Sequence, residues 1–462
     1  MIETEVKSFQ SIIEEGLKRV LTTKEKLLVT YTEKISFIEP LIFFERARNL
    51  KENRTFWKSA TEPFYLITVG ELYHVKGQDE QRYKDTFKEW EKLRKSALIY
   101  NPYNVEGTGL ILSGGMSFDV KEKRTALWEK YPPSEFVVPR FTYTIKDGTC
   151  YLTTTVLLSE EDETTKINER IKRDKEILTT LNVNIELKNT IKSKSEVKPE
   201  QWKKSVQEAI DYIQSEKAEK IVMARKLIVE LEKDVEITPI LKQFLSLQKT
   251  SYIFAYERGN HCFIGATPER LVRVNGKKLL STCLAGTAPR GKTEEEDKAL
   301  HDELFHDEKN RLEHDHVVQM IHRSIKDYCT FLDIPEKPQV IQLQDLQHLY
   351  TPVVGELKPN FSVFDIIQQL HPTPALGGAP TDVALRFIRE KETFERGWYG
   401  SPVGWLDDRH NGEFAVAIRS GLIQGDKIFL FAGCGVMGDS DVDLEFQETA
   451  IKFLPMLTAL EE

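Results

Sequence analysis

The sequence predicts an α+β protein in which large antiparallel β-sheets form the core and helices pack outside them. Strand-like segments mostly follow one another across tight turns, as at Lys146-Asp147-Gly148 and Gly259-Asn260. Strict alternation of one strand with one helix, which a doubly wound parallel sheet requires, is less frequent. Of the 462 residues, 40% are hydrophobic and 30% charged, a normal balance for a folded chain with a substantial core.

The first half of the chain mixes helical and strand patterns. Residues 3–22 carry apolar side chains at helical spacing, which predicts an amphipathic first helix, and a charged helix is expected over residues 78–98. Segments rich in β-branched and aromatic residues predict the strands, namely KLLVTYTEKI, FYLITVGELYHV, GLILSGGMSFD and EFVVPRFTYTIKDGTCYLTTTVLL.

Charged residues dominate from residue 159 to about residue 199, as in SEEDETTKINERIKRDKE. The main interpretation is a solvated helix followed by a connecting loop. This segment is also the best candidate for a seam between an N-terminal part, residues 1–195, and a catalytic region, residues 196–462.

The second half contains closely spaced elements. Helices are expected over residues 201–216, in TPILKQFLSLQ and in the final segment FQETAIKFLPMLTAL. A long helix is expected within EEEDKALHDELFHDEKNRLEHDHVVQMIHRSIKDYCTFL. The expected strands are KIVMARKLIVEL, SYIFAYER and HCFIGATPERLVRV, and Gly-rich turns separate further strands near the end.

The bulk properties exclude several classes of partner. A net charge of −9 disfavours nucleic acid, and no apolar run approaches the roughly 18–20 residues that span a bilayer. The start, MIETEVKSFQ, lacks the basic and apolar regions of an export signal. Five widely spaced cysteines without a CxxC pair are typical of a reducing compartment. We therefore expect a cytoplasmic protein without membrane or nucleic-acid partners, with a monomer as the default state.

Carboxylates give the first chemical signal. Glu445 and Glu448 are three apart in the final helix and share a face, and Glu313 lies in the long helix. Glutamates from separate helices, with no cysteine partner, suit a hard cation such as Mg²⁺. With 73 acidic residues in the chain, solvated glutamate pairs are the more frequent alternative. The five histidines between residues 301 and 322 suit zinc poorly, because His314 and His316 do not share a helix face and no HExxH occurs.

Glycine-rich turns give the second signal, in LAGTAPRG, ALGGAP, YGSPVGW and FAGCGVMGDS. They serve equally well as tight turns between strands or as backbone amides that approach the carboxylates of a small ligand. Lys220 begins an apolar strand and Glu269 follows a Thr-Pro turn. Local sequence does not distinguish these two residues from other charged residues.

In the same order, motifs within about residues 200–460 resemble those of the chorismate-utilising enzymes, which include isochorismate, salicylate, anthranilate and aminodeoxychorismate synthases. The motifs are KIVMARKL, FIGATPERLVRV, LAGTAPRG, DEKNRLEHDHVV, LYTPVVGEL, HPTPALGGAP, GWYGSPVGW, GEFAVAIRS, FAGCGVMGDSD and EFQETAIK. Ten ordered motifs do not agree by chance. In this family the N-terminal strands usually join the same large sheets, so the resemblance implies that residues 1–195 are integrated into one fold with residues 196–462.

The resemblance implies roles for the residues at matching positions. Lys220 is similar to the general base of the family, and Glu269 is similar to its general acid. The implied substrate is chorismate, held by Gly286, Thr287, His348, Ala375, Leu376, Arg419, Gly433 and Lys452. The implied cofactor is Mg²⁺, with Glu313 and Glu448 as ligands and Glu445 in their shell.

The implied activity is conversion of chorismate to isochorismate, in which water adds at C2 and the C4 hydroxyl leaves. Family members that add ammonia usually lack lysine at the position of Lys220, and aminodeoxychorismate synthases often have lysine where this chain has Ala285. The apolar Leu376 fits a site that stops at isochorismate, and the chain length resembles that of the menaquinone-pathway enzymes. The alternatives are a salicylate synthase, a siderophore-pathway isochorismate synthase and a non-catalytic chorismate-binding protein.

Overall fold

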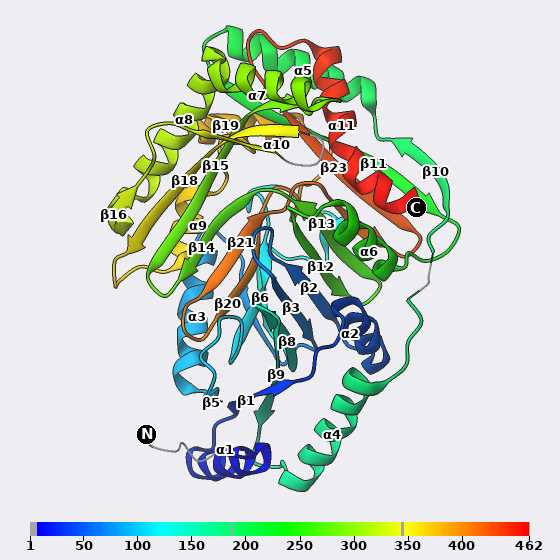
Figure 1. Cartoon of the computed structure of the whole chain (residues 1–462), viewed down its shortest axis with the longest axis vertical. Helices are drawn as coiled ribbons and strands as arrows, with labels where there is room; N and C mark the ends of the chain where they lie inside the picture. Colours follow the sequence, from blue (N-terminus) through cyan, green and yellow to red (C-terminus); the bar gives the residue numbers. More distant parts are fainter. Residues whose placement is uncertain (1–6, 186–187, 343–345, 462) are drawn as a thin grey trace.

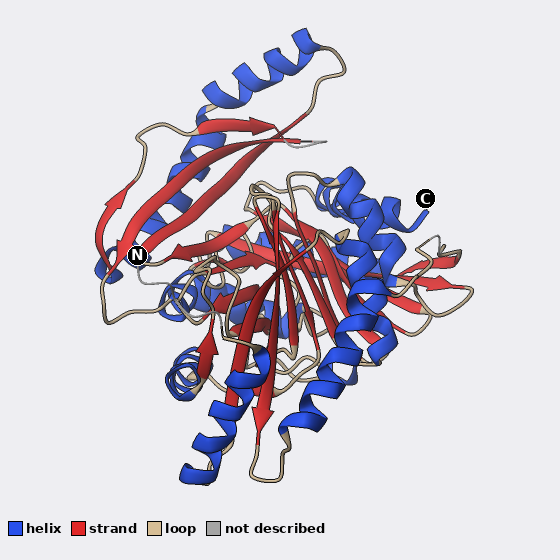
Figure 2. Cartoon of the chain, turned by 60° about the horizontal axis from the view of Figure 1, so that its bottom comes forward, coloured by secondary structure: helices blue, strands red, loops and turns tan. Residues whose placement is uncertain are grey.

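The computed structural model describes residues 7–185, 188–342 and 346–461, except for the side chain of Glu313. Two large β-sheets form the centre of the molecule, and helices lie along their outer faces (Figure 1). Figure 2, seen from another direction, shows the strands gathered between helices. This arrangement confirms the predicted fold class.

Among the described residues the larger sheet has 13 strands, in the order β10-β11-β23-β22-β13-β12-β2-β3-β8-β9-β1-β5, with β19 paired to β11. Its described strand pairs are antiparallel except for β1 with β5. In that order the strands span Ile191–Glu196, Lys220–Leu231, Lys427–Val436, Ser420–Gln424, His261–Thr267, Tyr252–Arg258, Arg54–Lys58, Phe64–Val69, Phe141–Lys146, Thr149–Leu158, Leu27–Ile35 and Leu98–Tyr100, and β19 spans Gly378–Ala379.

In the part of the chain that the structure describes, the smaller sheet has 10 strands in the order β16-β18-β15-β14-β21-β20-β6-β7-β4, with β17 paired to β18. Its described pairs are all antiparallel. In that order the strands span Cys329–Asp333, Leu346–Leu357, Lys278–Pro289, Arg270–Asn275, Gly412–Val416, Pro402–Asp407, Ile111–Met116, Ser134–Val138 and Tyr73–Gly77, and β17 spans Gln339–Gln342.

Both sheets combine strands from the two halves of the chain. In the larger sheet β2 pairs with β12, and in the smaller sheet β6 pairs with β20. The backbone hydrogen bonds of each sheet therefore run without interruption from early to late strands.

The helices form the outer layers. Buried side chains of α1, α2, α4, α6 and α11 pack on the larger sheet, those of α3, α8 and α9 on the smaller sheet, and those of α5 and α10 beside β11 and β23. No helix in the described ranges is long and apolar enough to cross a membrane. From α1 to α11 the helices span Phe9–Thr23, Pro40–Ala47, Arg82–Ser96, Thr164–Thr180, Pro199–Gln214, Ile237–Leu247, Glu294–His306, Glu308–Ile325, Val363–Leu370, Thr381–Lys391 and Val442–Glu461, and three short 3₁₀ helices span Arg48–Leu50, Ala126–Trp128 and Lys326–Tyr328.

Aromatic side chains form a separate buried cluster between the sheets. Trp57 and Phe263 come from the larger sheet and Trp405 from the smaller one, while Trp128 and Trp398 come from connecting segments. Each of these rings is at most 2% exposed. Large aromatic side chains bury much apolar area, so this cluster holds the sheets at a fixed separation.

The structure divides two elements that the sequence predicts to be continuous. HCFIGATPERLVRV is two strands, β13 and β14, which stop on either side of Pro268-Glu269 and belong to different sheets. The predicted long helix is two helices, α7 and α8. Asp307 separates them, because its side chain accepts a hydrogen bond from Asn310 N (2.6 Å) and caps α8.

The charged segment after residue 159 is less solvated than its composition predicts. It forms α4, whose Ile167, Ile171 and Leu178 are buried in the core on the larger sheet. It continues to β10, which pairs with β11 at the sheet edge. A few apolar residues at helical spacing are enough to anchor a mostly charged helix.

Candidate active site

Two connecting segments run side by side from one sheet to the other sheet, and each carries a predicted site residue. Glu269 lies between β13 of the larger sheet and β14 of the smaller one, and Arg419 lies between β21 and β22. Backbone hydrogen bonds join the crossings, from Val416 N to Glu269 O (3.0 Å) and from Ala266 N to Arg419 O (3.1 Å). The fold therefore brings a carboxyl group and a guanidinium group together at the divergence of the sheets.

Glu269 is a carboxyl group with an unusual proton affinity. Burial raises its pKa from 4.5 to about 7, and the opposing pull of Arg419 and Lys452 does not offset that effect. A carboxyl group with a pKa near 7 is present partly as the acid at neutral pH. It can therefore donate a proton in a reaction, as a general acid must.

Arg419 stands in the left-handed backbone region, with φ of +50°. Burial lowers the pKa of its guanidinium, while Tyr399, Glu448 and Glu269 oppose this. Arginine stays charged in proteins despite such shifts. Arg419 is thus a buried cation whose charge interacts with two carboxyl groups and a phenol, and Tyr399 is a site residue that the sequence predictions did not include.

Lys452 supplies a second cation from α11. Its Nζ donates to Gly433 O on β23 (2.9 Å) and forms an ion pair with Glu448. A Cβ at Gly433 would lie 3.3 Å from the Tyr399 hydroxyl, so the glycine lets the phenol lie against the strand. The predicted residues Arg419, Gly433 and Lys452 therefore belong to one cluster.

The smaller sheet contributes Gly286, Thr287 and His348. Gly286 is the irregular residue of the β15–β18 ladder, with φ of +80°, a conformation that glycine adopts without strain. His348 pairs with Thr287 in that ladder, and its Nδ1 lies 3.0 Å from Thr287 Oγ1. Burial, with help from Arg419, lowers the pKa of His348 to about 4, so the ring is neutral at pH 7.

Lys220 begins β11 and is half-buried. It pairs with Ala379 of β19, and its side chain crosses over Gly435 on the neighbouring strand β23. A Cβ at Gly435 would lie 2.6 Å from Lys220 Cε and 3.2 Å from its Nζ. Only glycine at that position leaves room for this lysine conformation.

Gly435 is a second residue that the sequence predictions did not include. Gly433 was selected from the motif FAGCGVMGDSD, and Gly435 stands two residues later on the same strand. Residues two apart on a strand share a face, so strand periodicity could have identified it.

The three predicted metal ligands come from two helices. Glu445 and Glu448 lie in the first turns of α11, whereas Glu313 lies in α8 and its side chain is outside the described part. Glu445 Oε1 accepts from Ser440 Oγ (2.7 Å), while Oε2 is buried without a partner among the described residues. Within that part of the chain, no three His, Cys, Asp or Glu side chains are grouped as a metal site. A buried carboxylate oxygen without a donor fits the ligand of a hard cation.

The loop before β19 carries Ala375 and Leu376. Ala375 is exposed in a turn, and Leu376 is 6% exposed in the hydrophobic cluster on the smaller sheet. Arg396 Nη1 donates to Leu376 O (2.9 Å), and Arg396 Nη2 donates to Val222 O on β11 (2.8 Å). The loop is therefore fixed to the strand that carries the lysine, and direct contact of its side chains with a substrate remains a prediction.

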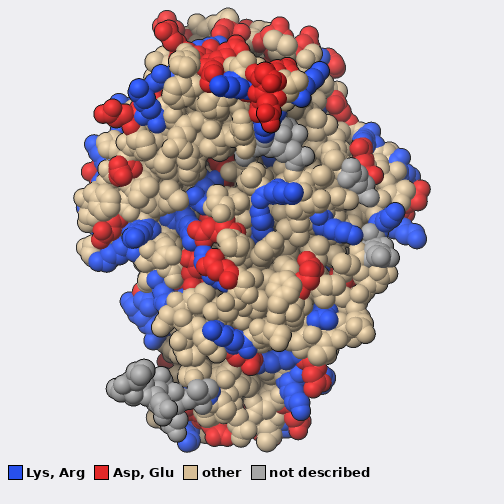
Figure 3. Space-filling model, in the orientation of Figure 1, with Lys and Arg blue, Asp and Glu red and all other residues tan. Residues whose placement is uncertain are grey.

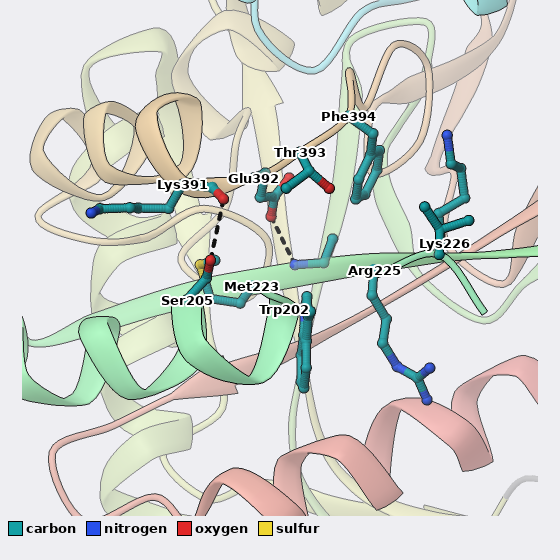
Figure 4. A pocket seen from close by; sticks show the side chains of 11 residues that line it. Trp202, Ser205, Met223, Arg225, Lys226, Lys391, Glu392, Thr393 and Phe394 are labelled. Carbon is teal, nitrogen blue, oxygen red and sulfur yellow. Dashed lines mark hydrogen bonds between the residues drawn. The ribbon is translucent and has the colours of Figure 1, made fainter. Parts of the chain in front are cut away.

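A small cavity lies further along β11, between that strand, α5 and the segment after α10 (Figure 4). Trp202 and Arg225 lie on one side of the strand, and Glu392 and Phe394 lie on the other. Its volume of about 10 Å³ holds roughly one water molecule. It is thus too small for an organic substrate, and neither Glu269 nor Arg419 lines it.

The chain resembles known proteins over its whole length. A family model described as chorismate binding enzyme matches residues 15–461. Isochorismate synthase MenF of Bacillus subtilis (strain 168) is 37% identical over 466 residues, which cover 100% of this chain and 99% of that protein. The salicylate biosynthesis isochorismate synthase of Pseudomonas aeruginosa is 29% identical and covers 98% of this chain and 94% of its own length.

A solved structure shows the same fold. The structure of MenF, the menaquinone-specific isochorismate synthase from Escherichia coli, matches with a TM-score of 0.80 over 97% of this chain and 100% of that chain, at 23% identity. The arrangement of two sheets described above is therefore shared with that enzyme.

Proposed function

Because the chain belongs to the family of chorismate binding enzymes, we propose that it is an isochorismate synthase that carries out water addition with Lys220 and Glu269. The observation that carries this proposal is the match, from end to end, with an isochorismate synthase. The geometry supports it, because a carboxyl group with a pKa of about 7 stands beside two cations. An acid and a cationic binding site are what the reaction requires from the protein.

In the proposed reaction one water molecule adds at C2 of chorismate and one hydroxyl leaves from C4. Lys220, in its neutral form, takes a proton from the water as the new C–O bond forms. Glu269 gives its proton to the departing C4 hydroxyl, which leaves as water. As the C2–O bond forms, the ring double bond between C1 and C2 moves to C1 and C6, the one between C5 and C6 moves to C4 and C5, and the C4–O bond breaks. The protons balance once Lys220 and Glu269 exchange theirs with solvent.

Chorismate has two carboxylates, and the site has neighbouring groups to hold them. Arg419 and Lys452 supply charge, and Thr287 Oγ1 and the backbone at Gly286 supply hydrogen-bonding groups at the ladder irregularity. The neutral His348 adds an uncharged polar side chain beside them. These cations also explain how a chain with a net charge of −9 attracts an anionic substrate.

We further propose that the enzyme uses Mg²⁺, held by Glu313 and Glu448 with Glu445 nearby. The unpartnered Oε2 of Glu445 and the half-exposed carboxylate of Glu448 fit an oxygen-ligand site. When bound, Mg²⁺ would neutralise a substrate carboxylate and stabilise charge spreading toward it. The residues of the chain then need only orient the ring and move the two protons.

We place the activity in menaquinone biosynthesis in the cytoplasm. The support for the pathway is the full-length match to MenF of Bacillus subtilis, together with the fold shared with the enzyme called the menaquinone-specific isochorismate synthase. The support for the cytoplasm is the free state of the five cysteines. An isochorismate synthase of another pathway is the second candidate, because a relative that matches 98% of this chain is named a salicylate biosynthesis isochorismate synthase.

Identification of the product tests the proposed function. Purified protein with chorismate and Mg²⁺ should yield isochorismate by chromatography, and Lys220→Ala and Glu269→Gln should each lower kcat by about 10²–10⁴-fold. Salicylate and pyruvate as the main products would assign the lyase reaction instead. Full activity in Lys220→Ala, or activity insensitive to EDTA, would refute the proposed mechanism.

A further inference from the structure

His314 is a completely buried histidine between α8 and the smaller sheet. Its Nδ1 lies 3.1 Å from Ala285 O on β15, and its Nε2 lies 2.7 Å from Thr351 Oγ1 on β18. Cys283 Sγ lies 3.6 Å from Nδ1 and contacts His314 O at 3.8 Å. One side chain of α8 therefore makes polar contacts with two adjacent strands.

The contacts define which ring nitrogen carries the hydrogen. A carbonyl oxygen only accepts, so Nδ1 is the donor toward Ala285 O, and Nε2 accepts from the Thr351 hydroxyl. Both polar atoms of the ring are satisfied, which offsets the cost of burying them. An apolar residue would fill the same space without fixing the direction of α8.

The bonded strands carry the predicted substrate-binding residues. Ala285 directly precedes Gly286 on β15, and Thr351 lies three residues after His348 on β18. The helix lies against the same irregularity, because a Cβ at Gly286 would lie 3.3 Å from Asn310 Oδ1 on α8. Glu313, the residue before His314, is the α8 residue predicted to bind the metal.

We propose that His314 is a positioning residue that holds α8, and with it Glu313, at a fixed distance from the Gly286 turn and His348. The proposal rests on the proposed function, because it concerns the Mg²⁺ and chorismate sites of that reaction. Removing a residue that orients a metal ligand without touching the metal typically lowers metal affinity or activity by about 10–100-fold. A histidine that only fills the core would instead change the stability of the protein.

Two substitutions distinguish a positioning role from a purely structural one, because each keeps a hydrogen-bonding group in place of a different ring nitrogen. His314→Asn keeps a donor nitrogen attached to Cγ, where Nδ1 is, and so keeps the bond to Ala285 O. His314→Gln places the amide one bond further from the backbone, toward Thr351. It therefore loses the hydrogen bond to Ala285 O. We would measure Mn²⁺ binding from the EPR signal of free Mn²⁺, kcat and KM for chorismate, and the Tm of each variant.

The expected result is a rise of about tenfold or more in the Mn²⁺ dissociation constant of His314→Gln, with a matching loss of kcat/KM. His314→Asn loses only the bond from the Thr351 hydroxyl and should therefore weaken Mn²⁺ binding less, by about threefold, at a similar Tm. Equal Mn²⁺ affinity in parent and His314→Gln, or losses that follow Tm alone in both variants, would overturn the proposal.

A third variant decides the case if neither histidine variant folds. Thr351→Val keeps the shape of the strand residue and removes the hydroxyl that holds Nε2. Weaker Mn²⁺ binding in this variant would support the proposal, and unchanged binding would overturn it. Because Mn²⁺ binding needs no turnover, a parent protein that binds Mn²⁺ but forms no isochorismate would refute the proposed function separately.

Discussion

Glu269 shows how the environment sets the chemistry of a single residue. Its two cationic neighbours favour the carboxylate, whereas burial favours the acid, and burial is the larger effect. Nothing in the local sequence TPERL distinguishes it from the other glutamates, since its environment comes from strands far away in the chain. The resemblance to known enzymes selected this residue, and the sheet crossings explain why it differs from the others.

Replacement of this carboxyl group should stabilise the protein at alkaline pH. The pKa of Glu269 is about 7 in the folded chain against 4.5 ordinarily, so the ionised form costs stability. That cost is absent below pH 4.5, grows as the pH rises toward 7 and is complete above it. At pH 8 Glu269→Gln should therefore unfold at a higher temperature than the parent, with an unfolding free energy that is larger by about 1–3 kcal/mol. At pH 4.5 it should show no such gain. Thermal unfolding at both pH values would detect this, and an equal shift at both would contradict it.

A methyl group at Gly435 should disable Lys220 without unfolding the chain. The added Cβ of Gly435→Ala would lie 2.6 Å from Lys220 Cε, and this flexible side chain can move away more easily than the strand. We expect kcat to fall about 10–100-fold while Tm changes little.

Gly438→Ala is the matched control for that variant. A Cβ there would meet its nearest atom at 3.5 Å, an ordinary contact, in the same segment of the chain. Wild-type kcat in Gly435→Ala, or an equal loss in both variants, would argue against the position given to Lys220.

At the level of elements, hydrophobic periodicity predicted most helices and strands. The strand KIVMARKLIVEL is β11 over its full length, because alternating and branched apolar residues face two buried layers. The division between β13 and β14 was not predicted, since apolar residues continue on both sides of Pro268. A change of sheet depends on partners elsewhere in the chain, and periodicity carries no information about partners.

The N-cap of α8 offers a test of an element that carries site residues. Asp307→Ala removes the acceptor for Asn310 N and should lower the unfolding free energy by about 0.5–2 kcal/mol. Asp307→Asn keeps an acceptor and should cost much less. Denaturant unfolding of the two variants would measure the difference, and equal stability would show that the cap contributes nothing.

Over the whole molecule, charge is balanced locally. Figure 3 shows acidic and basic side chains interspersed on the face in view, without a broad basic surface. That nucleic acid is not a partner, as expected from the net charge of −9, remains a prediction. The cations proposed to hold an anionic ligand are Arg419, at a crossing between the sheets, and Lys452 on α11.

The division of the chain at residues 195 and 196 remains a prediction, and the topology indicates how separate parts would behave. A fragment of residues 196–462 would lose the partners of β12 and β20 and expose two sheet edges. We expect this fragment to aggregate when it is expressed alone. Soluble fragment with a cooperative thermal transition would show instead that residues 196–462 fold independently.

The central claim, that Lys220 and Glu269 add one water molecule and remove another hydroxyl, is tested most directly with labelled water. Chorismate is converted in H₂¹⁸O, and the isochorismate is analysed by mass spectrometry and NMR. The account predicts that the C2 hydroxyl of the product carries ¹⁸O, because its oxygen comes from solvent. Isochorismate with unlabelled oxygen at C2 would show that the hydroxyl moves within the molecule, and would contradict the roles given to both residues.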